Sequence, residues 1–203
     1  MKKYLQTILQ CVALFSLLTT LSCAAFQTVR IVPVFDPEAT ILQQSGGVIH
    51  VKNGITVIVV PLNDVKAVDA FGVVIYNNTG HFVSLKQKDC WMLDQAQNKT
   101  RVLDKSEHSF FLGKNFKPKM PPGFPAEVFR WNKTLRMDGP PVALPQEDIE
   151  TTTVMAGRRQ QFYLYFRKRS INASQLRIII PKVYNEFDDV ETTFVFKFEV
   201  KKG

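Results

Sequence analysis

The side chains that most often carry catalysis or bind metals are few and far apart in this sequence. Its histidines are His50, His81 and His108, and none belongs to a closely spaced pair or to a Cys/His cluster. A metal centre needs three or four converging ligands, and the Gly-x-Ser-x-Gly turn of many hydrolases is absent. We therefore expect no metal, no cofactor and no enzymatic activity. The sequence leaves open one alternative of this kind, an exported hydrolase in which folding brings His81 or His108 beside a carboxylate.

Carboxylates concentrate in two short runs, Glu147-Asp148-Ile149-Glu150 and residues 186–191. Neither run has the ligand spacing of an EF-hand calcium loop. We expect both to be solvated loops, with the second joining the last two strands of the chain.

The clearest chemical signal is the thiol of Cys23. Lys2 and Lys3 precede an apolar run at residues 11–18, which has the length of a signal-peptide core. The run is too short to cross a bilayer, which takes about 20 residues. It ends in Leu21-Ser22-Cys23, so residues 1–22 are predicted to be a leader.

This leader resembles that of bacterial lipoproteins, in which a short lipobox ends in Ser, Gly or Ala followed by Cys. Here Thr20 stands where that family usually has Leu. The resemblance implies that Cys23 is acylated and becomes the N-terminus, which gives the protein a lipid anchor in the membrane. Two or more acyl chains hold a protein stably, whereas one does not. The resemblance also implies delivery to the outer membrane in a Gram-negative cell, facing the periplasm, because Ala24 and not Asp follows the cysteine.

Ordinary cleavage after Ala24 is the competing interpretation, since Ser22-Cys23-Ala24 also fits the small-x-small rule. It would give a secreted protein. Such a protein would be a glycoprotein if its sequons were used, and these begin at Asn77, Asn98, Asn132 and Asn172.

Cys90 would be left without a disulfide partner if Cys23 is acylated, because Cys11 lies in the leader. It sits in the apolar stretch Asp89-Cys90-Trp91-Met92-Leu93, so we expect a buried, unreactive thiol. Removing the leader also lowers the formal charge from +8 to +6. A basic exported domain suits an anionic envelope polymer, a lipid head group or an envelope protein as its partner, and not nucleic acid.

A basic run around one predicted strand, residues 160–167, is the candidate binding surface. Arg158 and Arg159 precede the strand, and Arg167, Lys168 and Arg169 come at its end or follow it. Charges at strand ends commonly protect a sheet edge. The sharper hypothesis is a site for a phosphate-bearing partner, because Tyr163 and Tyr165 are expected on the outer face and exposed aromatics beside arginine are typical of interfaces. Phe124 and Trp131 complete the candidate surface.

Alternating apolar residues predict an almost entirely β structure. Phe194, Phe196 and Phe198 alternate with Val195 and Lys197, and the same period of two occurs at residues 162–167 and 176–180. Asn53-Gly54 between two β-rich runs predicts a two-residue hairpin turn. The second arm of that hairpin is apolar on both faces, so it is expected at the centre of its sheet.

Residues 113–149 interrupt this pattern. Seven of the eleven prolines fall between Pro118 and Pro145, and proline cannot donate to a strand ladder. We expect a long proline- and aromatic-rich loop packed over the sandwich. The one helix we predict is a turn or two near residues 106–112.

The succession of strands from residue 70 to 200 resembles the immunoglobulin-like domains of bacterial envelope lipoproteins. The matching features are the strand that ends in Asn77-Asn78-Thr79, the hairpin after Leu93-Asp94, and the aromatic strand after Gly157. No cysteine pair bridges the sheets, as one does in antibody domains. The prediction is an all-β antiparallel immunoglobulin-like sandwich, with an anchor segment and first strand at 23–45 and a single domain at 46–203. The expected function is non-enzymatic binding or assembly at the cell envelope.

Overall fold

The computed structural model describes residues 29–134 and 151–202, so the predicted leader and Cys23 lie outside the described residues. Residues 30–201 form one unit, and residues 1–29 with 202–203 are divided from it. The elements are β1 (Val29–Pro33), β2 (Thr40–Ile41), β3 (Val48–Lys52), β4 (Ile55–Pro61), β5 (Asp69–Asn77), β6 (Val83–Lys86), η1 (Gln87–Asp89), β7 (Trp91–Asp94), β8 (Lys99–Arg101), α2 (Lys105–Leu112), α3 (Phe124–Trp131), β9 (Thr151–Val154), β10 (Arg159–Phe166), β11 (Gln175–Asn185) and β12 (Val190–Lys202).

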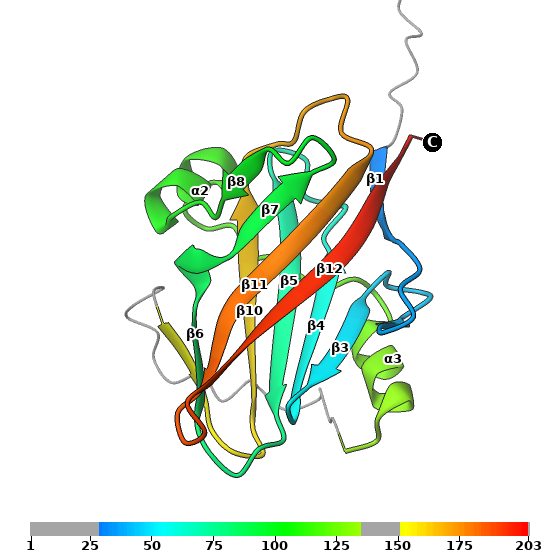
Figure 1. Cartoon of the computed structure of the whole chain (residues 1–203). Helices are drawn as coiled ribbons and strands as arrows, with labels where there is room; N and C mark the ends of the chain where they lie inside the picture. Colours follow the sequence, from blue (N-terminus) through cyan, green and yellow to red (C-terminus); the bar gives the residue numbers. More distant parts are fainter. Residues whose placement is uncertain (1–28, 135–150, 203) are drawn as a thin grey trace, which may run out of the picture. The chain divides into compact units, whose positions relative to one another are not determined.

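The strands form two antiparallel sheets, which confirms the predicted all-β sandwich. Sheet A has the order β1-β12-β11-β6-β9, and β7 pairs with β11 and carries β8 at its other edge. Sheet B has the order β10-β5-β4-β3-β2. In Figure 1, β11 and β12 cross in front of β5 and β4 of the other sheet.

The main core lies between the two sheets. Both sheets contribute alternate residues, such as Phe194, Phe196 and Phe198 from β12 and Phe71, Val73 and Ile75 from β5. These six side chains are completely shielded from solvent. Burying one such side chain contributes about 1.5–3 kcal/mol. The alternating apolar residues of β5 and β12 therefore supply much of the driving force for folding.

The β3–β4 hairpin has the register that its turn predicts. Asn53 and Gly54 both have positive φ, at 50° and 72°, as a type I′ turn requires. His50 pairs with Val57 and Val51 with Thr56. All residues of β4 are buried, and the strand lies between β3 and β5, as expected from its two apolar faces.

A second apolar cluster covers the outer face of sheet B. Outward residues of β4 and β5, including Ile58 and Val74, pack there with Phe124 and Val128 of α3. Leu112, at the end of α2, and Met120 pack against the same cluster. The central strands of sheet B, β4 and β5, are therefore buried on both faces, whereas sheet A has one face in the core. Figure 1 shows α3 beside β3 and α2 beside β8.

The helix α3 corrects the prediction that residues 113–149 form a loop throughout. Gly123 precedes the helix with φ of 80°, and Pro125 lies in its first turn. Proline is tolerated there because the first N–H groups of a helix have no partner within it. The Glu127 carboxylate then accepts backbone N–H groups of Gln44 and Ser45, at 2.6 and 2.8 Å. Burial alone would raise the pKa of Glu127, but these hydrogen bonds hold it below its ordinary value.

The helix α2 confirms the prediction near residues 106–112. Asp104 caps it, accepting the Glu107 N–H at 2.8 Å, while Glu107 accepts the Asp104 N–H in return. Both helices are eight residues long, and no helix in the described part of the chain is long and apolar enough to cross a membrane.

Candidate binding surface

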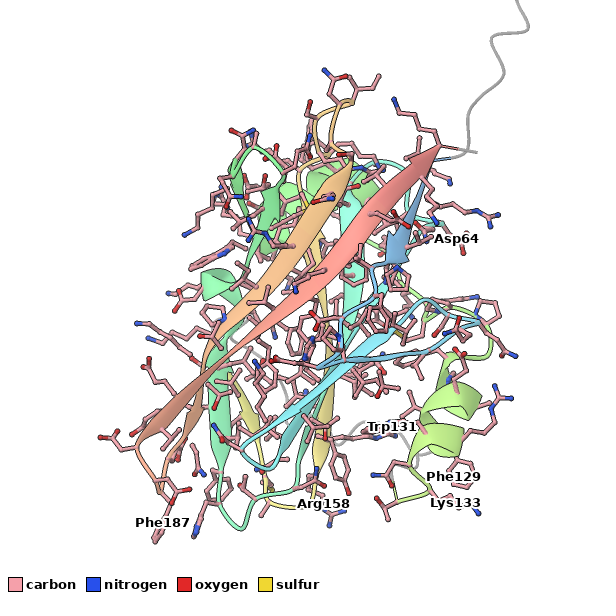
Figure 2. All side chains as sticks on the ribbon, turned by 45° about the vertical axis from the view of Figure 1, so that its right-hand side comes forward. Asp64, Phe129, Trp131, Lys133, Arg158 and Phe187 are labelled. Carbon is pink, nitrogen blue, oxygen red and sulfur yellow. The ribbon has the colours of Figure 1, made fainter. Side chains whose placement is uncertain are left out.

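The basic residues chosen from the sequence do not form one site. Arg158 and Arg159 lie at the start of β10, and Arg167 follows its last residue. Eight steps of about 3.3 Å separate Arg159 from Arg167 along an extended strand, or roughly 25 Å. Figure 2 shows Arg158 at the same end of the molecule as Phe187 of the β11–β12 turn. A single phosphate group could not reach both ends of β10.

Tyr163 and Tyr165 are not the exposed aromatics that we expected. Tyr165 is 7% exposed, and its ring packs 5.0 Å from that of His108 on α2. Burial, with Tyr163 nearby, raises the pKa of Tyr165 to about 12. Tyr163 is half-buried and accepts a hydrogen bond from Gln161 at 2.7 Å. The prediction failed because it treated the outer face of sheet B as open to solvent.

Phe124 and Trp131 belong to the same covered layer. Phe124 is completely buried, and the half-buried Trp131 packs against the second cluster. They stand at the first and last positions of α3, with Val128 between them. Steps of four and then three residues place Phe124, Val128 and Trp131 on one face of the helix. Phe124 therefore holds α3 to the sheet, and because it is buried it cannot be part of a binding surface.

The basic run after β10 is partly neutralised inside the protein. Asp69 is 1% exposed and binds the Arg169 guanidinium, the Arg169 backbone N–H and the Lys168 ammonium. Only 7% of the Arg169 side chain is exposed. Arg167 shares the Glu107 carboxylate with Arg101, at 3.3 and 2.8 Å. Arg169 is thus a structural residue, and Arg158 and Arg167 remain as separate exposed charges.

A pocket of about 270 Å³ opens on sheet A, beside the loop between β7 and β8. It was not foreseen from the sequence. Its walls combine apolar atoms with amide, cationic and carboxylate groups, and are formed by Val34, Leu93, Asp94, Gln95, Gln97, Gln175, Leu176, Arg177, Lys197 and Phe198.

Strand pairing brings the polar wall together. Arg177 of β11 stands opposite Leu93 of β7 on one side and Lys197 of β12 on the other. Their neighbours Met92, Ile178 and Phe196 point into the core. Since side chains alternate along a strand, Leu93, Arg177 and Lys197 form a row on the outer face.

Internal hydrogen bonds hold the pocket's side chains in place. The Arg177 guanidinium donates to the side-chain carbonyl of Gln97 at 2.6 Å, and the Lys197 ammonium lies 2.8 Å from the Asp36 carboxylate. The Asp94 carboxylate accepts the N–H groups of Ala96 and Asn98 and the Asn98 amide. These bonds, that of the Asn98 side chain foremost, lower the pKa of Asp94. A guanidinium has five N–H donors and an ammonium three, so Arg177 and Lys197 keep donors for a ligand.

The sequence indicates which side chains of the pocket face outward, but not that they lie close together. Arg177 and Lys197 are the polar members of alternating strands, so their outward direction follows from the pattern. Their proximity depends on the pairing of β11 with β12 and β7. Leu93 and Arg177, which pair across β7 and β11, are more than 80 positions apart in the sequence.

The other residues that could carry catalysis, metal binding or modification make structural contacts instead. His81 stacks on Phe187 with ring centroids 3.9 Å apart, and His108 packs on Tyr165. In the described ranges, no group of three or more His, Cys, Asp or Glu side chains is placed to hold a metal ion. Asn77 is completely buried, so the folded chain has no room for a glycan there. Cys90 is buried as predicted, and burial raises its pKa to about 12.

Comparison with known proteins places the chain in no family. No family model matches it, and neither a curated protein nor a solved structure matches it significantly. Its function must therefore be argued from its own residues.

Proposed function

We propose that the protein is a lipid-anchored component of a bacterial cell envelope that acts by binding. The anchor is the acylated Cys23, and the placement is the outer membrane with the domain facing the periplasm. Leu21-Ser22-Cys23 after a short apolar run supports this placement. The domain is an immunoglobulin-like sandwich. Its stacked antiparallel sheets support that assignment, and the helical layer over sheet B distinguishes it from a plain sandwich.

The pocket on sheet A carries the binding part of the proposal. Arg177 and Lys197 present N–H donors beside the amides of Gln97 and Gln175, and Leu93 adds an apolar wall. Clustered donors with an arginine suit carboxylate and hydroxyl groups. The ligand class that fits is an acidic saccharide unit of an envelope polymer.

Mass spectrometry of the protein extracted from membranes tests the anchor. We expect loss of residues 1–22 and a diacylglyceryl mass on Cys23, and we expect Cys23→Ser to release the protein from the membrane fraction. An unmodified N-terminus at Ala25 would contradict the anchor without bearing on the pocket.

Binding of an acidic oligosaccharide, such as oligogalacturonate, tests the pocket. Arg177→Gln should weaken binding about tenfold or more, because a hydrogen bond to a charged group contributes about 1.5–3 kcal/mol. Lys86→Gln removes the same charge from the exposed end of β6 and is the matched control. Equal effects of the two substitutions would indicate binding by net charge alone and would reject the pocket as the site.

A further inference from the structure

Three phenylalanines in and just after α2 project into solvent. Phe110 is 84% exposed, Phe111 41% and Phe116 38%. The rings of Phe110 and Phe111 touch each other edge to face, with centroids 5.4 Å apart. Single exposed apolar residues are common, but neighbouring exposed aromatics mark a contact surface.

Four lysines flank these phenylalanines in the sequence. Lys105, Lys114, Lys117 and Lys119 are all exposed. Residues 105–123 contain one acidic residue, Glu107, and its carboxylate already binds Arg101 and Arg167. The segment therefore carries a positive charge that its own acids do not balance. We call Phe110, Phe111, Phe116 and the four lysines the Phe/Lys patch.

The patch is held by the fold at both ends. The capping box of Asp104 and Glu107 fixes the start of α2, and Leu112 packs against the second cluster. Gly113 ends the helix with φ of 85°, and its carbonyl accepts the Phe116 N–H at 3.2 Å. Met120 then packs over Gly72 of β5. Leu112 and Met120 thus anchor the segment, and the phenylalanines face outward.

The chemistry of the patch distinguishes between two kinds of partner. Lysine is depleted at protein–protein interfaces, whereas lysines interspersed with aromatic residues favour the surface of an anionic bilayer. There the ammonium groups meet the head groups and the rings enter the acyl boundary. The charge and the exposed rings together favour the membrane.

We propose that the Phe/Lys patch docks the domain on an anionic lipid surface. This contact is separate from the acyl chains on Cys23 and from the pocket on sheet A. It would orient the anchored domain against the bilayer.

Depth-dependent fluorescence quenching tests the proposal on the full-length chain carrying Cys23→Ser, so that no acyl chain contributes to the membrane contact. The probes are Phe110→Trp and the control Phe35→Trp, because Phe35 is 80% exposed after β1 and lies outside the patch. The signal of each probe is its difference from the parent chain, in which Trp91 and Trp131 already fluoresce. The vesicles contain brominated phosphatidylcholine, with or without a quarter of phosphatidylglycerol. We expect a blue shift and quenching at position 110 on the anionic vesicles only, and neither effect at position 35.

Charge substitutions give a second measurement. In the same Cys23→Ser chain, Lys114→Gln, Lys117→Gln and Lys119→Gln together should weaken vesicle partitioning about a hundredfold at low salt. Substituting Lys52, Lys66 and Lys86 in the same way should change it much less. Since all six lysines are at least partly exposed, unchanged thermal unfolding verifies the fold.

Two results would overturn the proposal. One is equal quenching at positions 35 and 110, and the other is no quenching at 110 on anionic vesicles; the second would leave the patch to a protein partner. Absence of acylation at Cys23 would reject the anchor without changing the quenching at position 110.

Discussion

The side chain of Met120 lies directly over the α-carbon of Gly72. A β-carbon at Gly72 would come within 3.0 Å of the Met120 sulfur and terminal methyl group, a separation that real contacts do not show. The Met120 side chain can therefore pack flat on sheet B because residue 72 has no side chain.

Gly72→Ala should destabilise the protein by about 1 kcal/mol, the lower end of the usual cost of overpacking, because the end of the Met120 side chain can move aside. Adding Met120→Ala should recover part of that loss, so the two effects will not be additive in urea unfolding. Gly80→Ala, where nothing lies within 4 Å of the added carbon, is the control. Additive effects of the two substitutions would show that the contact is not formed.

Asn77 ties three segments together at the end of β5. Its side-chain amide donates to the carbonyls of His81 and Val154, at 2.7 and 2.8 Å, and its carbonyl accepts the N–H and the hydroxyl of Thr79. Asn77→Ala removes these four hydrogen bonds, the one to the buried Val154 carbonyl among them, so we expect a loss of about 2–4 kcal/mol in the free energy of unfolding. Asn115→Ala, at an exposed position after α2, should cost less than about 0.5 kcal/mol. Similar losses for both variants would contradict the structure.

His50 should make stability sensitive to mild acid. It is 3% exposed, and neither ring nitrogen has a hydrogen-bond partner. Desolvation lowers its pKa below the usual 6.5, against the opposing effect of Asp36. The unfolded chain therefore takes up more protons below pH 6.5, and stability falls as the pH decreases toward the folded-state pKa.

Urea unfolding at pH 7.5 and 5.5 measures this effect. His50→Leu should unfold within about 1 kcal/mol of the parent at pH 7.5, because it removes two unsatisfied polar atoms. It should lose less stability than the parent on going to pH 5.5. Carboxylates with lowered pKa values, such as Asp36, act below pH 3.8 and do not contribute in this range.

Cys90 should resist thiol reagents in the folded protein. With a pKa of about 12, only about one molecule in ten thousand carries the thiolate at pH 8. In the Cys11→Ser, Cys23→Ser variant, Cys90 is the remaining cysteine. Its reaction with a disulfide reagent should be at least a thousandfold faster in urea than in buffer. Comparable rates would indicate that the core around Cys90 opens readily.

Local signals in the sequence predicted the sheets well. The Asn53-Gly54 turn set the β3–β4 register, and the alternation of phenylalanines in β12 identified the face that enters the core. The candidate surface was predicted poorly. Tyr163 and Tyr165 have the alternation of outward residues, but the pattern cannot show that α2 and the following segment cover them. The prolines of residues 113–149 predicted a loop, but Pro125 lies in the first turn of α3.

The sequence by itself determined the strands, the all-β class, the buried character of Cys90 and the chemistry expected at Cys23, because each depends on the residue type and its near neighbours. Only the tertiary structure decided which faces are open. It covered sheet B with α3, buried Arg169 on Asp69, and joined Arg177 with Lys197 beside a pocket. These outcomes depend on pairing between distant segments, which hydrophobic periodicity does not encode.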